Sequence, residues 1–596
     1  MSAPARSAGR WLAARRAPLR LLMFRLLCGV AAVLGVYVAA ALAGARHAGW
    51  IAASGGLVAA AAAAGSIRTV PGSFFTFAPL RRASATTAPA VLLAVAAVLF
   101  LAVLMPVLTT KVPAFDDYAN HLARVDLIAL HGSDALLNRF YSIRWRLVPN
   151  LGLDVLLPWL ANTIGLFASG KMFVAASMLL LLTGPHAIQL ALYRRLSAGP
   201  LVAAPFAYSM ITKMGLLNYE LGIGLALFAT AGWVALRQTH PLLRALVSAG
   251  CVLAIFFCHL VALAVYGLAI GSFELWLLGA QPRPLRRIVT DLAVLVLPFV
   301  PAIPLLLLGP ADHAAAIPWQ WGGVHTRLDG LRYVVQAYYR DADVAAMAAA
   351  VAGFLWAVRR RILYFPPFGW IFLAVAAVVY LVTPDMAMGS WGAAGRLPTA
   401  FLLVILGFLH WDLSSHRLRR AFLLAVVVLT LFRAAAVEAV FWRFDRIRVD
   451  FETSLKQVSP GSRILIANNY PNEVEALTAP EELPCLAIIE RSSLVSIAYS
   501  HPLQQILVVN PPYRAMTGGY DDAPIPLPVL LDPSLYGTAR NRPIYDPSGR
   551  VYWSDWTHDY DYLYVLNPAD PANPAPDRLD LLYNGDRFQL FRVRHS

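Results

Sequence analysis

The chain has 596 residues, of which 59% are hydrophobic and 14% are charged. Together with a mean hydropathy of +0.60, this composition excludes an ordinary soluble domain and indicates an integral membrane protein. The formal net charge is +15, but the arginines stand in short clusters between apolar runs. They form no basic face with interleaved aromatic residues, which argues against a nucleic-acid-binding protein.

Apolar runs of membrane-spanning length follow one another along the chain and predict about thirteen transmembrane helices. The arginine clusters between the runs are expected in the cytoplasm, so an odd number of spans places the C-terminus outside. We split the run 245–279 at His259, because two helices there keep both flanking clusters inside. The first run is interpreted as a retained helix and not as a cleaved signal. The expected spans are 26–43, 50–66, 88–108, 172–193, 199–213, 215–236, 245–260, 261–279, 289–309, 343–358, 366–384, 397–412 and 421–442.

This pattern predicts a polytopic α-helical membrane protein with a C-terminal extracytoplasmic α/β domain. Residues 1–86 are expected to form a cytoplasmic segment and an accessory transmembrane hairpin. Residues 87–445 form the transmembrane domain, with extracytoplasmic loops at 109–171 and 310–342, and residues 446–596 form the extracytoplasmic domain. In that last region, strands are expected at 464–467, 494–498, 505–509 and 562–566, with a hairpin around Asn584 and Gly585. The expected location is the cytoplasmic membrane of a bacterium.

An acidic segment directly follows the apolar run that ends at Leu108. Asp116 and Asp117 open an expected helix that runs to about His131, and such groups are costly at a membrane boundary unless water, a partner or a substrate satisfies them. Asp117, His121 and Arg124 lie at i, i+4 and i+7, on one stripe of that helix. The stripe predicts an amphipathic helix at the membrane surface whose polar side faces water or a cavity. Asp126 falls among the apolar residues and Ile128 on the stripe, so we expect polar groups on both sides and not a simple interfacial helix. The alternative is that the aspartates only cap the helix; we favour a site, because one can cap while the other projects.

The motif Asp116-Asp117-Tyr118 and the helix after it, in a first long extracytoplasmic loop, resemble the GT-C superfamily of membrane glycosyltransferases. The layout of many helices and a C-terminal extracytoplasmic domain is similar to its protein O-mannosyltransferase-like and aminoarabinose-transferase-like members. The resemblance implies an enzyme that takes a sugar from a polyprenyl-phosphate carrier outside the cytoplasm, usually with inversion. The acceptor would be an envelope glycan, lipid or protein.

Such a reaction needs a carboxylate for the acceptor nucleophile and cations for the departing lipid phosphate. Asp116 or Asp117 is the candidate base, and both are predicted as catalytic. Interface anchoring by some of the cations and helix capping by Glu220 are the open alternatives, and His259 could be only a turn residue. The candidate substrate-binding residues are Tyr118, His121, Arg124, Lys213, Glu220, His259, Arg327, Arg340 and Arg396.

Cysteine and metal patterns contribute little. The four cysteines form no disulfide framework or zinc spacing, so no metal site is predicted, although a divalent cation on the two aspartates stays open because some superfamily members use one. No Gly-rich phosphate loop is present, which disfavours direct use of a nucleotide sugar. Two alternatives to a transferase remain: a transporter or flippase of a lipid-linked saccharide, and a non-catalytic envelope assembly protein.

Overall fold

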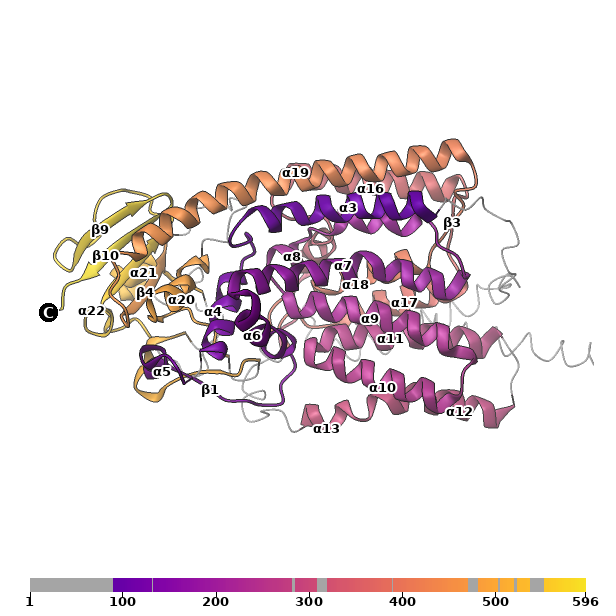
Figure 1. Ribbon diagram of the computed structural model, residues 1–596, viewed down its shortest axis with the longest axis horizontal. Coiled ribbons are helices and arrows are strands. Elements are labelled where there is room, and N and C mark those ends of the chain that lie inside the picture. The colour runs from indigo at the N-terminus through magenta and orange to yellow at the C-terminus, as the bar shows by residue number, and fades with distance from the viewer. Residues whose placement is uncertain are drawn as a thin grey trace, which may run out of the picture.

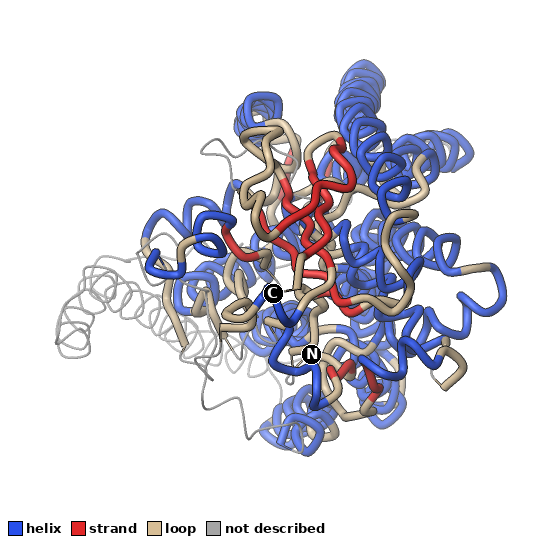
Figure 2. The backbone as a smooth tube through the Cα atoms, turned by 90° about the vertical axis from the view of Figure 1, so that its left-hand side faces the viewer, coloured by secondary structure: helices blue, strands red, loops and turns tan. Residues whose placement is uncertain are grey.

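The computed structural model describes residues 89–130, 132–280, 284–307, 319–387, 390–469, 481–501, 504–518, 523–535 and 551–595. The predicted spans 26–43 and 50–66 lie outside these residues. Helices run along the long axis of the molecule, and a sheet covers one end of them (Figure 1). Figure 2 looks onto that end, with the strands in front of the helices.

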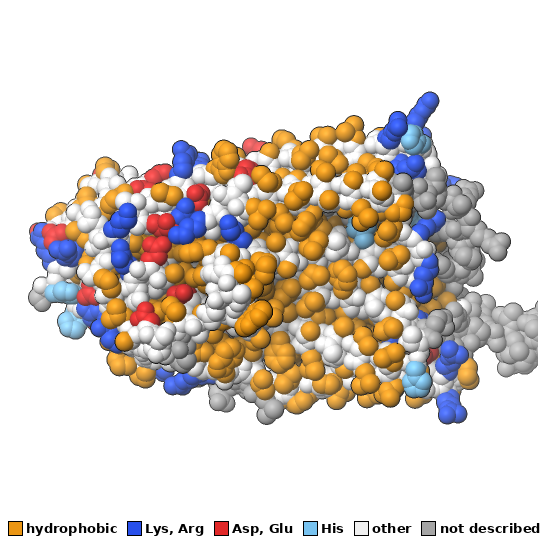
Figure 3. Space-filling view, viewed as in Figure 1, with side chains coloured by type: hydrophobic (Ala, Val, Ile, Leu, Met, Phe, Trp, Pro, Cys, Tyr) orange, Lys and Arg blue, Asp and Glu red, His pale blue; other side chains and the backbone are white. Residues whose placement is uncertain are grey.

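Ten helices make up the elongated bundle in the described part of the chain. Hydrophobic side chains cover its middle, whereas Lys and Arg side chains gather at the end opposite the sheet (Figure 3). Seven segments of the described residues are long and apolar enough to cross a membrane, including Leu285–Leu307 as one segment. The fold is therefore that of a multi-pass membrane protein. The helices are α3 (Pro89–Thr109), α7 (Leu166–Tyr193), α9 (Leu217–Ala235), α10 (Pro241–Cys258), α11 (Leu260–Ala280), α12 (Leu285–Val296), α16 (Arg340–Arg359), α17 (Pro367–Val382), α18 (Leu397–Phe408) and α19 (His416–Leu455).

The break between α10 and α11 falls at His259, so the predicted division of 245–279 into two helices is confirmed. His259 has extended backbone angles, and one of its ring nitrogens accepts the Val261 N–H at 3.1 Å. The side chain thus satisfies one of the free N–H groups at the start of α11.

The prediction of a continuous helix at 199–213 is wrong. The segment forms a 3₁₀ helix, η2 (Gly199–Phe206), and one short turn, α8 (Met210–Lys213). Pro200 and Pro205 lack the N–H that a regular helix needs. The broken segment still runs along α3, because Leu201 packs in the cluster with Leu92 and the Tyr208 hydroxyl donates to the Val103 carbonyl. Irregular backbone is tolerated at membrane depth where protein surrounds it.

Smaller elements connect the bundle to the sheet and close its other end. The first loop joins the C-terminal region directly, because β1 pairs antiparallel with β6. The elements of the first loop are α4 (Tyr118–Ala129), α5 (Ala135–Phe140), β1 (Tyr141–Ile143) and α6 (Gly152–Ile164). The elements between the long helices are η3 (Leu236–Gln238), η4 (Leu297–Phe299), α13 (Ala302–Leu307), α15 (Val324–Arg332), β2 (Leu363–Tyr364) and β3 (His410–Trp411).

The sheet has the order β5-β4-β8-β10-β9, and β7 also pairs with β4. Strands β5, β7 and β8 are parallel to β4, whereas β10 is antiparallel to both β8 and β9. The strands of this sheet are β4 (Arg463–Asn468), β5 (Leu494–Val495), β7 (Ile525–Pro526), β8 (Tyr562–Leu566), β9 (Leu579–Gly585) and β10 (Phe588–Val593), whereas β6 (Leu507–Val509) pairs with β1 in a separate sheet. The helices among them are η6 (Leu483–Cys485), α20 (Leu486–Arg491), η7 (Pro511–Met516), α21 (Leu527–Leu531), η8 (Pro533–Leu535) and α22 (Trp556–Asp559).

Candidate functional site

The two aspartates lie at the sheet end of the bundle, against the turn that precedes α9. The Asp116 N–H donates to the Lys213 carbonyl at 2.7 Å, and the Asp117 N–H donates to the Met214 carbonyl at 3.2 Å. Lys213 Nζ lies 3.0 Å from Asp116 Oδ2 and 3.2 Å from Oδ1. The Asp116 side chain keeps 21% of its surface exposed, so the ion pair is accessible from outside the protein.

Gly215 allows these two segments to approach each other. Its φ is +76°, and a Cβ there would lie 3.1 Å from the Asp117 backbone nitrogen. A side chain at this position would therefore strain the turn and push the acidic segment away from Lys213.

His121 and Arg124, on the predicted stripe of α4, are buried among protein groups and do not face water, so α4 is not a simple interfacial helix. Arg124 is 1% exposed; its Nε lies 2.7 Å from Asp154 Oδ1, and Asp154 is fully buried. Its Nη2 donates to His121 Nδ1 at 3.1 Å, while His121 Nε2 donates to the Gly215 carbonyl at 3.2 Å. Burial, with Arg124 beside it, lowers the pKa of His121 to about 3. The neutral His121 ring therefore holds the Gly215 turn in place through its hydrogen bond to the Gly215 carbonyl.

The side chains of Tyr118 and Glu220, two further predicted site residues, are also buried. Tyr118 is fully buried, and its hydroxyl has no hydrogen-bond partner among the described residues. Glu220 is buried near the start of α9 and accepts a hydrogen bond from Thr212 at 2.6 Å. Asp117 occupies the N-cap position of α4, but its side chain makes no capping hydrogen bond.

Arg396 directly precedes α18 and is 8% exposed. Its Nη2 donates to the Trp391 carbonyl at 2.6 Å, and its Nη1 lies 3.0 Å from His259 Nε2. Burial lowers the pKa of Arg396, and the nearby Tyr219 and Asp117 raise it. The charge of Asp117 therefore acts on this arginine.

The contacts of His259 leave Arg396 incompletely satisfied. Burial and the neighbouring Arg396 lower the pKa of His259 to about 3, so the ring is neutral. A neutral imidazole has one acceptor nitrogen, yet Nδ1 faces the Val261 N–H and Nε2 faces the guanidinium. The Nε of Arg396 also has no partner among the described residues.

Arg327 on α15 is a second buried arginine in this region. It is 5% exposed, its Nη2 donates to the Thr383 carbonyl at 2.6 Å, and its guanidinium lies 5.6 Å from the centre of the Tyr380 ring. Its Nε and Nη1 have no partner in the described part of the chain. Burial raises the pKa of Asp385, whereas Arg327 and Arg396 lower it. Both arginines thus act on one carboxylate.

Arg340 is the first residue of α16, and its side chain is not among those described. The structure adds one neighbour that sequence reasoning did not single out. Asn120 on α4 holds the segment after β5, because its Nδ2 donates to the Ile497 carbonyl and its Oδ1 accepts the Tyr499 N–H, each at 3.3 Å. Tyr499 also acts electrostatically on Arg396, so the C-terminal region borders the site.

A divalent cation fits these residues poorly. Across the described ranges, no three His, Cys, Asp or Glu side chains form a group that could hold a metal ion. Asp116 and Asp117 would supply two carboxylates, but the ammonium of Lys213 is next to one of them and opposes a second positive charge. We derive no step through a metal.

Comparison with known proteins gives two structural likenesses. No family model and no curated protein matches the chain. It is similar to ArnT from Cupriavidus metallidurans in the apo state, with a TM-score of 0.46 and 13% identity over 84% of this chain and 97% of that one. It is also similar to the arabinofuranosyltransferase AftD from Mycobacteria, with a TM-score of 0.42 and 16% identity over 86% of this chain and 40% of that one.

Both TM-scores are below 0.5, so the proposal that follows rests on the site. That site combines two accessible carboxylates, one lysine and two incompletely satisfied arginines at one end of a membrane bundle.

Proposed function

We propose that the chain is a GT-C-type glycosyltransferase that moves a sugar from a polyprenyl-phosphate carrier to an envelope acceptor. The observation that carries the proposal is the position of Asp116 and Asp117 beside Lys213 and Arg396, at the end of a bundle of apolar helices. A lipid substrate needs an apolar environment for its chain, cations for its phosphate and a carboxylate for the acceptor. These requirements meet at this place in the fold.

In the proposed reaction, the acceptor oxygen bonds to the anomeric carbon while the bond from that carbon to the phosphate oxygen breaks. The electron pair leaves on polyprenyl phosphate, where arginines stabilise the charge. The proton of the acceptor hydroxyl passes to a carboxylate acting as general base. Inversion follows if the acceptor attacks from the face opposite the phosphate.

Inversion places the base and the phosphate cations on opposite sides of the sugar. Asp117 is among the charges that act on Arg396, and Asp116 pairs with Lys213 at 3.0 Å. We therefore assign Asp116 as the base, held in place by Lys213. Asp117 then lies on the phosphate side and orients Arg396.

The distribution of charge supports an orientation with the site outside the cytoplasm. At the end of the bundle opposite the sheet, Lys and Arg side chains have few Asp or Glu among them, whereas at the sheet end both signs are mixed (Figure 3). Positive residues favour the cytoplasmic side of a membrane. The sheet and the aspartates would then face the outside of a bacterial cytoplasmic membrane, where polyprenyl-phosphate sugars serve as donors.

The test is sugar transfer by reconstituted full-length protein supplied with a panel of hexosyl and pentosyl polyprenyl phosphates and an envelope extract as the acceptor. Asp116→Asn should lower kcat by about 10²- to 10⁴-fold, the usual contribution of a general base. Asp117→Asn should mainly raise the KM for the donor. Asp126→Asn is the matched control, because Asp126 is on the same helix but takes no part in the site. Full transfer by both Asp116→Asn and Asp117→Asn would overturn the proposal.

A further inference from the structure

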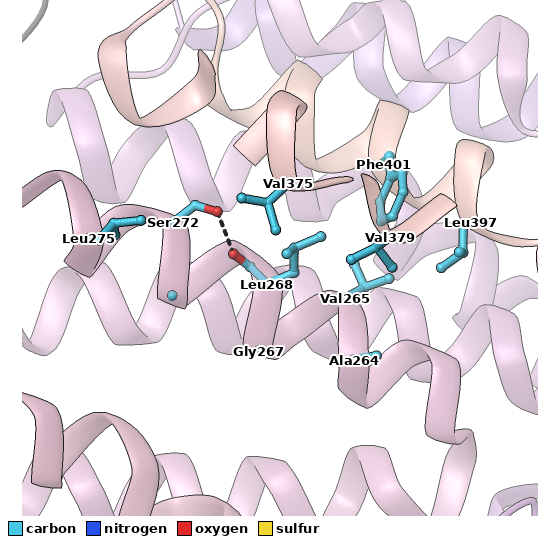
Figure 4. A pocket seen from close by; sticks show the side chains of 11 residues that line it. Ala264, Val265, Gly267, Leu268, Ser272, Leu275, Val375, Val379, Leu397 and Phe401 are labelled. Atoms are coloured by element: carbon cyan, nitrogen blue, oxygen red, sulfur yellow. Dashed lines mark hydrogen bonds between the residues drawn. The ribbon is translucent and has the colours of Figure 1, made fainter. Parts of the chain in front are cut away.

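Two hydroxyl groups inside the bundle are satisfied by a carbonyl of the preceding helical turn. Ser272 on α11, among the apolar side chains of Figure 4, donates to the Leu268 carbonyl at 2.7 Å. Thr230 on α9 donates to the Ala226 carbonyl at 2.8 Å in the same way. In each case one hydrogen meets one acceptor, so the local helix is enough to satisfy the hydroxyl.

Thr212 in α8 has a different set of neighbours. Its Oγ1 lies 2.6 Å from Glu220 Oε1, 2.9 Å from the Ala207 carbonyl oxygen and 3.4 Å from Ser209 Oγ. A threonine hydroxyl carries one hydrogen, and neither a carbonyl nor an ionised carboxylate can donate one. With Glu220 ionised, two acceptors would therefore compete for the hydrogen of Thr212. With a proton on Glu220, the carboxyl donates to Thr212 and Thr212 donates to Ala207, so both short contacts are hydrogen bonds.

The surroundings of Glu220 also favour a neutral acid. The side chain is 4% exposed, and it interacts with no Lys, Arg or His in the described part of the chain. Its Oε2 has no hydrogen-bond partner among the described residues. The phenols of Tyr208 and Tyr338 are within electrostatic reach, but they donate to the carbonyls of Val103 and Ala114. Burying an unpaired carboxylate costs far more free energy than burying a neutral carboxyl group.

The position of Thr212 matters because the next residue is Lys213. The Lys213 ammonium pairs with Asp116, and its carbonyl accepts the Asp116 N–H. Thr212 and Lys213 lie in a single helical turn, α8, which follows the interrupted helix η2. The contact with Glu220 ties this short turn to the first turn of α9, a helix of 19 residues.

We propose that Glu220 is a positioning residue that keeps its proton, and that its neutral carboxyl holds Thr212 and thereby presents Lys213 to Asp116. A neutral acid also does not compete with Asp116 for the Lys213 ammonium. The positioning role rests on the proposed function, because Asp116 is the base assigned there. The proton on Glu220 does not depend on that assignment.

Infrared spectroscopy of the full-length protein in nanodiscs, at neutral pH and without substrate, tests the proton on Glu220. A protonated carboxyl group has a carbonyl band that lies apart from the bands of carboxylates. The difference spectrum between wild type and Glu220→Gln should contain this band. Glu452→Gln is the matched control, because Glu452 pairs with Lys111 and Arg448 and is ionised. Absence of the band from the Glu220→Gln difference spectrum would overturn the inference.

Sugar transfer tests the positioning role. Glu220→Leu should lower kcat by about tenfold or more, the effect of leaving a buried hydroxyl without its partner. Glu220→Gln should retain most of the wild-type kcat, because its amide can also donate to Thr212. Thr212→Val should match Glu220→Leu, and the double variant should lose little more, because both substitutions remove the same hydrogen bond. Thr230→Val is the matched control and should leave kcat unchanged.

A Glu220→Gln variant as impaired as Glu220→Leu would show that an ionised glutamate is required and would overturn the inference. An unchanged kcat in Thr212→Val would overturn it as well, including the case in which Glu220→Leu does not fold. If the wild-type protein transfers no sugar from any donor, the proposed function fails, whereas the infrared measurement still decides whether Glu220 carries a proton.

Discussion

Removing Arg124 should destabilise the protein strongly, because its partner is one of the most buried acids in the described chain. The two side chains are 1% and 0% exposed, and Arg124 Nε lies 2.7 Å from Asp154 Oδ1. Burial raises the pKa of Asp154, and Arg124 lowers it. In Arg124→Met the carboxylate loses this countercharge, and breaking a buried pair from one side costs about 3–5 kcal/mol.

The double variant Arg124→Met/Asp154→Leu separates this charge effect from lost packing. Replacing both members of a buried pair by apolar residues is often close to neutral, so most of the lost stability should return. The loss in Arg124→Met should also shrink as the pH falls, since protonation removes the unpaired charge of Asp154. Equilibrium unfolding in mixed micelles measures these differences. A loss below about 1 kcal/mol in the single variant, or no recovery in the double variant, would show that the unpaired charge of Asp154 does not cause the loss of stability.

Three further substitutions test the structural roles of His121, Gly170 and Arg433. The folded-state pKa of His121 is below its ordinary value, at about 3, so wild-type stability should fall as the pH drops from about 6.5 towards 3; His121→Gln should flatten that part of a melting-temperature profile, and an unchanged profile would contradict the neutral ring. Gly170→Ala would place a Cβ too close to the Tyr118 hydroxyl, so it should destabilise α4 by about 1–3 kcal/mol, measurable by hydrogen exchange of that helix. Arg433 binds Asp343 at 3.0 Å and the carbonyls of two loops; Arg433→Met should cost about 3–5 kcal/mol in unfolding experiments, and a near-neutral result would show that the pair is dispensable.

Much of the bundle was predictable because a membrane-spanning helix is a local property of the sequence. The runs that became α3, α7 and α19 are apolar over the length that a membrane requires. The segment 199–213, which is not the continuous helix that its apolar composition predicts, also has a physical explanation. Its composition is apolar, but Pro205 interrupts the hydrogen bonds of a helix, and hydropathy alone does not detect this.

The sequence alone indicates a site residue only where that residue would be energetically unfavourable near the membrane without a partner. Asp116 and Asp117 could be singled out because acids directly after an apolar run need a partner. The partner Lys213 is 97 residues away along the chain, and Tyr499 is 379 residues from Asn120, which holds it. No local pattern connects residues at such separations. The same limit applies to the pair of Arg124 and Asp154, since Asp154 comes from another helix.

We propose that the sugar leaves its lipid carrier at this site, and both halves of a labelled polyprenyl-phosphate sugar can be followed in proteoliposomes with an envelope acceptor. Polyprenyl phosphate and glycosylated acceptor should form in equal molar amounts, and Asp116→Asn should lower the rate of both by about 10²- to 10⁴-fold. Recovery of the donor intact, whether in its original leaflet or moved to the other one, would contradict a transferase and would instead identify a protein that binds or transports the lipid.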